Sequence, residues 1–396
     1  MGKKLLVIGV VIYVLSSVLS YLVFSNLGLG GGVVVSPPSL DEEGRLVFDG
    51  PKTEVCPISG EKFSKQQREW WEEHRPLGVM IENHIDSRPQ SGLSYADAVY
   101  EALAEGGITR FMAVYHCQDA GTVGPVRSAR VYFLDYISEY GEYPLYAHVG
   151  GANCNASTGE GCANGAKADA LGFIDKWGWR FYNDLDQMAF DDLTYKRIQG
   201  KLTTASGGPV ATEHTMYSTT QGLWDYAEKK RDIAYKDADG NKWDEDFREW
   251  KFADDPKESD RPASQTLSYD FGSGADFAVR WKYDPASNKY KREMAGEPHI
   301  DLETEEQLAF KNVVLLFMDI SPANDGYTSG THLLYDTLGS GDALVYKNGE
   351  EIEATWNKKT RQSRLILEDE NGDEIELTRG PVWFSLLETG TPVSVR

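Results

Sequence analysis

The sequence has few basic residues for its length. Its 40 lysines and arginines are outnumbered by 62 aspartates and glutamates, so the formal net charge over 396 residues is −22. Nucleic-acid binding depends on a basic face that neutralises phosphates, and this composition therefore argues against a nucleic-acid partner. An anionic ligand would need a local pocket of positive charge.

The common catalytic signatures are also missing. The sequence contains no G-x-S-x-G elbow, Walker loop, G-x-G-x-x-G fingerprint or H-E-x-x-H motif. Its seven histidines are scattered, and its four cysteines lack the C-x-x-C spacing of zinc ligands, so we predict neither a metal nor a cofactor. Acidic stretches at 237–246 and 369–377 imitate calcium loops, but their glycine stands at the fourth position instead of the sixth, and we interpret them as β-turns.

Alanine is absent before Ala96, and no cysteine precedes Cys56. The apolar segment Leu5–Phe24 therefore lacks both the small-residue cleavage site of a secretory signal peptide and a cysteine for lipid attachment. Its twenty uncharged residues would span roughly 30 Å as a helix, the thickness of a bilayer core. Two lysines precede it, so we predict a retained signal anchor at residues 1–24, with the bulk of the chain outside the membrane.

The remaining chain divides into a tether and two domains. Residues 25–51 are rich in glycine, proline and serine, which predicts a flexible tether. Short apolar runs alternate with helical patterns over 52–252, which indicates an α/β domain with a mixed sheet. Over 253–396, short strand patterns with turn signals predict a mostly β domain. The expected fold class is α+β, preceded by a transmembrane helix.

Four cysteines are compatible with an oxidising, extracytoplasmic compartment. Cys154 and Cys162 flank the segment NASTGEG, which is flexible enough to close a disulfide. Cys56 and Cys117 would then be left to each other, although four cysteines allow three pairings. Disulfides are favoured over a zinc site.

Polar residues gather beside glycines in the α/β region, where such folds build binding sites. The segment GPVRSAR places Arg127 and Arg130 one turn apart at the predicted start of a helix, and Arg110 could add a third positive charge. With the N–H groups of the helix start they would form a cradle for phosphate, pyrophosphate or carboxylate. The alternative is internal pairing with neighbouring carboxylates, namely Glu101, Glu105 or Asp135. The sequence leaves both readings open.

Three histidines and one serine lie in the same polar segments. Each histidine could act as a general acid or base, or only hydrogen-bond within its loop. The serine could be an activated nucleophile or a helix cap, of which we favour the cap. No catalytic residue is assigned. The predicted ligand-binding residues are Arg110, Arg127, Ser128, Arg130, Glu105, His84, His148 and His214.

Several of these motifs resemble a known family. The runs CPISG, RPLGVMIENH, RPQSGLSYADAVYEALAEGGITRF, GPVRSARVYFLDY, HVGG and ATEHTMYS are similar to the YerB-like family of bacterial envelope proteins. VRWKYDPASNKYKR, GEPHID, GSGDALVYKNGEEIEATW and ENGDEIELTRGPVWFSLL resemble that family's C-terminal domain. The resemblance implies an envelope location and this two-domain architecture. It carries no activity, because the family is a domain of unknown function, and its members are described as lipoproteins, from which this chain differs in lacking a cysteine to lipidate.

Three functions remain open. We expect a membrane-anchored, extracytoplasmic envelope protein that binds an anionic ligand, such as a cell-wall polymer or a lipid-linked phosphate. The second hypothesis is a phosphoryl or glycosyl-phosphate transferase of cell-wall assembly. The third is a scaffold that docks another envelope protein. The expected partners are thus a bacterial cell membrane, through Leu5–Phe24, and an anionic ligand or an envelope protein.

Overall fold

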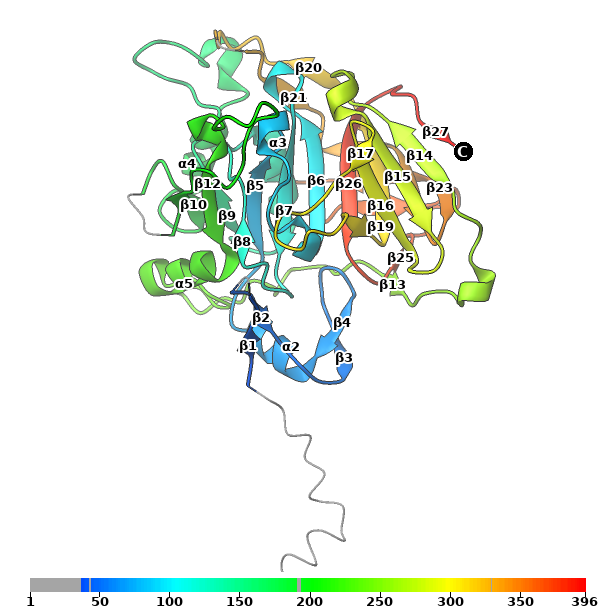
Figure 1. Cartoon of the computed structure of the whole chain (residues 1–396). Coiled ribbons are helices and arrows are strands. Elements are labelled where there is room, and N and C mark those ends of the chain that lie inside the picture. Colours follow the sequence, from blue (N-terminus) through cyan, green and yellow to red (C-terminus); the bar gives the residue numbers. More distant parts are fainter. Residues whose placement is uncertain (1–36, 43, 191–193, 329) are drawn as a thin grey trace, which may run out of the picture. The chain divides into compact units, whose positions relative to one another are not determined.

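Ten strands form one mixed sheet in the computed structural model (Figure 1). The structure describes residues 37–42, 44–190, 194–328 and 330–396. From one edge to the other, the order is β10 (Asp184–Asp186), β9 (Leu145–His148), β5 (Leu77–Glu82), β7 (Thr109–Tyr115), β6 (Ala98–Leu103), β26 (Val382–Glu388), β19 (Asn312–Met318), β22 (Gly339–Lys347), β23 (Glu350–Lys358) and β24 (Ile366–Glu368).

A parallel pairing joins the two halves of this sheet. Strand β6 pairs with β26 from Ala98 opposite Val382 to Ala102 opposite Leu386. The five strands on one side of this junction come from the first half of the chain, and the five on the other side from the second half. The α/β pattern and the β-rich pattern of the sequence therefore share one sheet.

Side chains of the central strands alternate between two hydrophobic cores, as the two-residue period of a strand requires. Along β7, Met112 and Val114 belong to one core, whereas Phe111, Ala113 and Tyr115 belong to the other. Helices α3 (Val131–Ile137) and α4 (Ala170–Lys176) pack in the first core, and α5 (Thr220–Arg231) packs in the second. Burial on both faces explains why residues 77–81 of β5 and 111–115 of β7 form apolar runs.

A six-stranded sheet contributes to the second core through Leu267, Trp281 and Tyr290. It contains β14 (Thr266–Tyr269), β15 (Val279–Asp284), β16 (Lys289–Met294), β17 (Glu297–Pro298), β18 (Ala309–Phe310) and β27 (Ser394–Val395). Figure 1 shows its yellow strands β14, β15 and β16 beside the red strand β26 of the large sheet. The second half of the chain is thus mostly β, as predicted.

The remaining strands form smaller units. Strands β8 (Thr122–Val123), β11 (Lys196–Arg197) and β12 (Met216–Thr219) make a three-stranded sheet. Two-stranded pairs are β1 (Ser39–Leu40) with β2 (Leu46–Val47), β3 (Lys52–Val55) with β4 (Lys62–Ser64), β13 (Phe252–Ala253) with β25 (Leu377–Thr378), and β20 (Ile320–Pro322) with β21 (Leu333–Tyr335). The antiparallel pairing of β1 with β2 therefore lies within the predicted tether.

Local signals of the sequence correspond to local features of the fold. The Ser64 hydroxyl accepts a hydrogen bond from the Gln67 amide and caps helix α2 (Lys65–Trp71). Thr219 caps α5 in the same way. Asn348 and Gly349 both have positive φ, which makes the primed turn that joins β22 to β23.

The predicted membrane anchor at residues 1–24 and the first part of the tether lie outside the described residues. Within the part of the chain that the structure describes, no helix is long and apolar enough to span a bilayer.

Candidate functional site

Arg127 pairs with a buried glutamate that the sequence analysis did not select. Strand β5 ends at Glu82, and the segment before α3 adds to that strand through a bridge between Ile81 and Val126. Arg127 Nε consequently lies 2.5 Å from Glu82 Oε2. The Arg127 side chain keeps 29% of its surface exposed, whereas that of Glu82 keeps 3%. The pair therefore sits at the surface with its cation outward.

The helix start differs from the prediction. Helix α3 begins at Val131, with Arg130 as its N-cap, so Arg127 lies outside the helix and the expected cradle of helix N–H groups is wrong. Ser128 is not the cap either, and its carbonyl oxygen accepts a hydrogen bond from Arg110 Nη1 at 3.1 Å. Arg110 and Arg130 are buried instead of facing a ligand. A buried cation is costly unless a carboxylate pairs with it, so each of these arginines needs an acidic partner.

Arg130 and Arg110 both approach Glu105. Arg130 makes a bidentate pair, with Nε 2.5 Å from Oε1 and Nη2 2.6 Å from Oε2, and Arg110 Nη2 lies 4.0 Å from Oε2. Burial would raise the pKa of Glu105, but the two arginines outweigh it and lower that pKa to about 2. Of the predicted internal partners, Glu105 is therefore confirmed.

Arg110 connects these two pairs. It stands directly opposite Glu82 in the pairing of β7 with β5. Burial would raise the pKa of Glu82, but Arg110 and Arg127 hold it below its ordinary value. We call Glu82, Glu105, Arg110, Arg127 and Arg130 the arginine cluster; it holds three positive and two negative charges.

Two of the predicted histidines meet beside this cluster. The rings of His84 and His214 stack with centroids 4.6 Å apart and planes 11° apart. His214 Nδ1 lies 4.0 Å from Glu82 Oε2, and 31% of the His84 side chain is exposed. Burial lowers the pKa of His214 against the opposing effect of Glu82. A neutral imidazole therefore stands next to Arg127 at neutral pH.

His148 belongs to a different, buried network. Its Nδ1 lies 2.8 Å from the Gly150 carbonyl oxygen, which can only accept, and its Nε2 lies 2.7 Å from Asp184 Oδ1. Both nitrogens therefore act as donors, and the ring is an imidazolium. Burial alone would lower the pKa of His148, but Asp184 and Asp186 outweigh it and raise that pKa.

The same network has the spacing of a metal site. His148, Asp184 and Asp186 offer ligand atoms within 4.8 Å of one another. Arg180 Nη1, however, lies 2.8 Å from Asp184 Oδ2 and 3.0 Å from Asp186 Oδ2. With both histidine nitrogens protonated and a guanidinium on the carboxylates, the arrangement is an ion-pair network of the sheet edge.

The His148 imidazolium predicts a pH dependence of stability. The folded state binds this proton more tightly than the unfolded state, so the contribution is complete below about pH 6.5, the ordinary value, and is lost as the pH rises through the raised pKa. His148→Gln should remove this contribution, so the free energy of unfolding of the variant should fall less steeply as the pH rises. Urea unfolding of both proteins between pH 6 and 9 measures it, and parallel curves would contradict the assignment.

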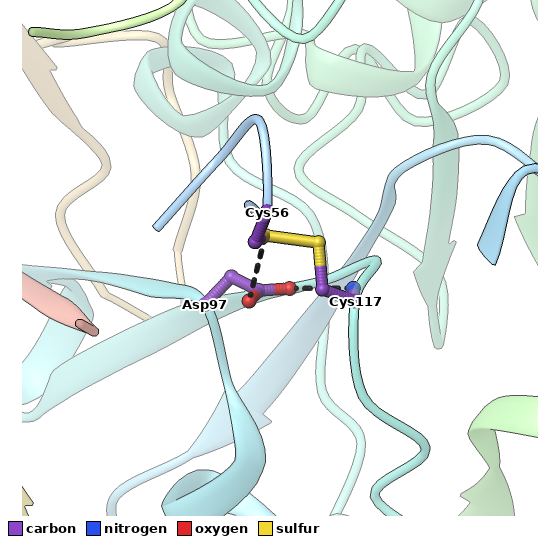
Figure 2. A group of neighbouring side chains, drawn as sticks. All are labelled: Cys56, Asp97 and Cys117. Carbon is purple, nitrogen blue, oxygen red and sulfur yellow. Dashed lines mark hydrogen bonds between the residues drawn. A yellow bond between two sulfur atoms is a disulfide. The ribbon is translucent and has the colours of Figure 1, made fainter. Parts of the chain in front are cut away.

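Both predicted disulfides are present. Cys56 joins Cys117, and Cys154 joins Cys162. Figure 2 shows the first of them beside the carboxylate of Asp97, whose oxygen Oδ1 lies 3.4 Å from Cys56 Sγ. Burial raises the pKa of Asp97 to about 7. Sequence reasoning missed Asp97, because no local pattern connects it to the CPISG turn.

A basic groove was also missed. It has a volume of about 690 Å³ and is lined by residues of α5, β11 and β12. Its charged lining residues are Lys196, Lys229, Lys230 and Asp225. Strand β12 also contacts the segment GPVRSAR, because the Val126 amide donates a hydrogen bond to the Met216 carbonyl oxygen at 2.7 Å. The lysine pair at the end of α5 was the available signal, but it is also the usual charge pattern of a helix C-terminus.

Comparisons with known proteins agree on one family. Residues 59–234 match a family model described as "Protein of unknown function (DUF3048) N-terminal domain", and residues 267–384 match its C-terminal domain. The chain is 27% identical over 345 residues to "Putative lipoprotein YerB" of Bacillus subtilis, covering 86% of this chain and 88% of that protein. The crystal structure of Bacillus subtilis YerB superposes with a TM-score of 0.63 at 25% identity, over 87% of this chain and 100% of the other.

Proposed function

The chain belongs to the family of proteins of unknown function described as DUF3048, and on that basis we propose that it is a membrane-attached, extracytoplasmic protein that binds an anionic ligand at Arg127. The relative from Bacillus subtilis carries the name of a lipoprotein, a protein held at a membrane. In this chain the apolar segment at residues 5–24 would hold it there. Two disulfides are in keeping with an oxidising compartment.

The observation that carries the proposal is the charge balance of the arginine cluster. Three arginines face two glutamates there, in a protein whose formal net charge is −22. Arg110 and Arg130 keep only 6% and 12% of their side chains exposed, so Arg127 is the cation that a ligand can reach. Its Nη groups donate no hydrogen bond to any described residue, which leaves a fork suited to phosphate or carboxylate.

The basic groove supports the same ligand class. It brings three lysines and one aspartate to the side of β12, the strand that contacts the segment before Arg127. A phosphate-bearing cell-wall polymer or a lipid-linked phosphate has repeated or branched charge that both features would attract.

Capture of a phosphate probe tests the proposal. Residues 39–396 form one compact unit, so their thermal unfolding can be followed with pyrophosphate, inorganic phosphate and citrate. A ligand at a hundred times its Kd stabilises the folded state by about 2.7 kcal/mol, which raises the midpoint by a few degrees. Arg127→Glu should weaken the affinity by about tenfold to a hundredfold, because it removes a hydrogen bond to a charged group.

Two matched charge reversals decide the outcome. Arg280→Glu changes an arginine that is half exposed and far along the chain, and it should leave the shift intact. Lys230→Glu changes the basic groove alone. If the ligand still raises the unfolding midpoint of Arg127→Glu, or fails to raise it only in Lys230→Glu, then Arg127 is not the binding residue.

The histidine pair favours one second function, a phosphoryl or glycosyl-phosphate transferase. A neutral His214 beside Arg127 could accept a proton from an attacking group while the arginine holds a phosphate. Release of phosphate from pyrophosphate in the same samples, lost in His214→Gln while the thermal shift is retained, would indicate turnover.

A further inference from the structure

The Cys56–Cys117 disulfide is enclosed in the protein. Neither cysteine has any exposed surface, and Asp97 is 1% exposed. The bond joins the turn between β3 and β4 to the residues after β7, and Asp97 precedes β6. A proton that leaves a thiol at this place cannot pass directly to water, so the protein itself must accept it.

The hydrogen bonds of Asp97 turn one oxygen toward the sulfur. Oδ2 accepts the backbone amides of His116 and Cys117, both at 2.9 Å. Oδ1 accepts the Ser59 hydroxyl at 3.0 Å and lies 3.4 Å from Cys56 Sγ (Figure 2). A disulfide sulfur has no hydrogen to donate, so this contact becomes a hydrogen bond only when Cys56 is a thiol or Asp97 is protonated.

Cys56 has a second supporting group. The Ser59 amide points at Cys56 Sγ at 3.5 Å, within the tight turn in which the Gly60 amide donates to the Cys56 carbonyl oxygen. An N–H group aimed at sulfur stabilises a thiolate, the reactive form in disulfide chemistry. Cys56 is therefore the cysteine that the structure prepares for deprotonation.

We propose that Asp97 is the general base that takes the proton from Cys56 when its bond to Cys117 closes, so that this carboxylate assists oxidation of the pair as the chain folds. The geometry assigns the roles of the two cysteines. Asp97 Oδ1 faces Cys56, whereas Cys117 contributes its backbone amide to the other carboxylate oxygen.

The exchange balances in two steps. The first step takes place before the turn that carries Cys56 packs against Cys117, because neither sulfur is exposed in the folded protein. The Cys117 thiol loses its proton to water, and its thiolate attacks one sulfur of a small disulfide RS–SR, forms Cys117–S–S–R and releases one thiolate RS⁻, which takes up a proton from water. Cys56 then gives its proton to Asp97 Oδ1, and its thiolate attacks Cys117 Sγ, which breaks the bond to SR and releases the second RS⁻. Two protein thiols are oxidised and one external disulfide is reduced to two thiols. Asp97 then passes its proton to the second released thiolate, which leaves as RSH.

The surroundings keep Asp97 able to accept a proton near neutral pH. Burial raises its pKa to about 7, and the hydrogen bonds from Cys117, His116 and Ser59 act in the opposite direction. The titratable groups that face it are Glu61, Tyr115 and Tyr140. The two phenols are neutral over the range of interest, since burial raises the pKa of each well above its ordinary value.

The test measures closure of the disulfide in the full chain. The reduced protein is mixed with excess oxidised glutathione, quenched with acid, alkylated, and analysed by mass spectrometry for each cysteine pair. Asp97→Asn is isosteric: its amide oxygen can accept both backbone N–H groups, and its NH₂ can donate to Ser59, but it cannot take a proton. We expect the intramolecular closure of Cys56–Cys117 to be about tenfold to a hundredfold slower in Asp97→Asn at pH 7.5.

The chain contains its own control. Cys154–Cys162 has no carboxylate among its described contacts, with Cys162 Sγ near only the Glu160 carbonyl oxygen at 3.6 Å. Its closure rate should be the same in both proteins. Equal closure of Cys56–Cys117 in the two proteins at every pH would overturn the proposal.

A second variant keeps the proposal testable if Asp97→Asn does not fold. In the wild type, the closure rate of Cys56–Cys117 should rise with pH and level off above the pKa of Asp97, whereas Cys154–Cys162 should keep rising toward the pKa of a thiol. Ser59→Ala removes a hydrogen bond that lowers the pKa of Asp97, so it should move the midpoint to higher pH. Identical profiles for the two pairs, or an unmoved midpoint, would refute the role of Asp97.

Discussion

Replacing Arg292 with alanine should lower the free energy of unfolding by about 3–5 kcal/mol, because it strands a buried carboxylate. Both oxygens of Glu101 lie within 2.9 Å of Arg292 Nη2, and neither side chain is exposed. Thr109 and Trp383 also donate hydrogen bonds to Glu101. After the substitution these two donors remain, but the guanidinium paired with Glu101 is gone.

The pair links two sheets. Glu101 lies on β6 of the large sheet, and Arg292 lies on β16 of the six-stranded sheet. The Arg292 guanidinium stands 4.4 Å from the ring centre of Trp383, on β26. Loss of the arginine therefore removes an ion pair and a cation–π contact from one enclosed place. Glu101→Ala should be as costly, because Arg292 would then be the unpaired charge.

A neighbouring exposed pair serves as the control for this prediction. Arg280 and Glu293 face each other on β15 and β16, with 51% and 20% of their side chains exposed. Arg280→Ala should cost less than about 1 kcal/mol. The double replacement Glu101→Leu with Arg292→Met should recover much of the loss, since apolar pairs of similar volume replace buried ion pairs well. Urea unfolding measures all four variants; similar losses for Arg292→Ala and Arg280→Ala would contradict the assignment.

Removing the Cys56–Cys117 disulfide should lower stability by about 4 kcal/mol, against about 2.5 kcal/mol for Cys154–Cys162. The difference comes from the unfolded chain, because the first bond closes a loop between cysteines 61 residues apart and the second between cysteines 8 residues apart. The longer loop gains more conformational freedom when it is opened.

Serine replacements in pairs measure this difference. One double variant carries Cys56→Ser with Cys117→Ser, and the other carries Cys154→Ser with Cys162→Ser. Each replaces two cysteines by two serines, so the chemical change is the same in both. Guanidinium unfolding at neutral pH then gives the two losses of free energy. An equal loss for both pairs would show that native contacts, and not loop length, determine the contribution of each bond.

Features that depend on a few adjacent residues could be predicted from the sequence. Ser64 lies directly before its helix, so the cap was recognisable. The Asn-Gly pair at residues 348–349 defines its own turn. The cysteine pairing was accessible for the same reason, since the short loop between Cys154 and Cys162 left one remaining pair.

The candidate site depends on contacts that the sequence does not encode locally. The N-cap of helix α3 is Arg130, two residues after the expected cap Ser128, because Val126 is held against Ile81 by a bridge to another strand. Glu101, one of the partners expected for the arginines, is instead bound by Arg292, 191 residues away. The stacking of His84 on His214 likewise needs the folded chain. Whether the arginine cluster binds a ligand stays a prediction.

The place of β26 has a consequence for the order in which the protein can assemble. This strand lies in the middle of the ten-stranded sheet, between β6 and β19, yet its residues 382–388 follow both of these strands in the sequence. A chain that emerges from its amino end presents β6 and β19 long before their shared neighbour exists. Both strands then carry unpaired backbone edges, which are templates for aggregation. Closure of the large sheet must therefore wait until residues 382–388 have been made, and a truncation before residue 382 leaves two half-sheets with no strand to join them.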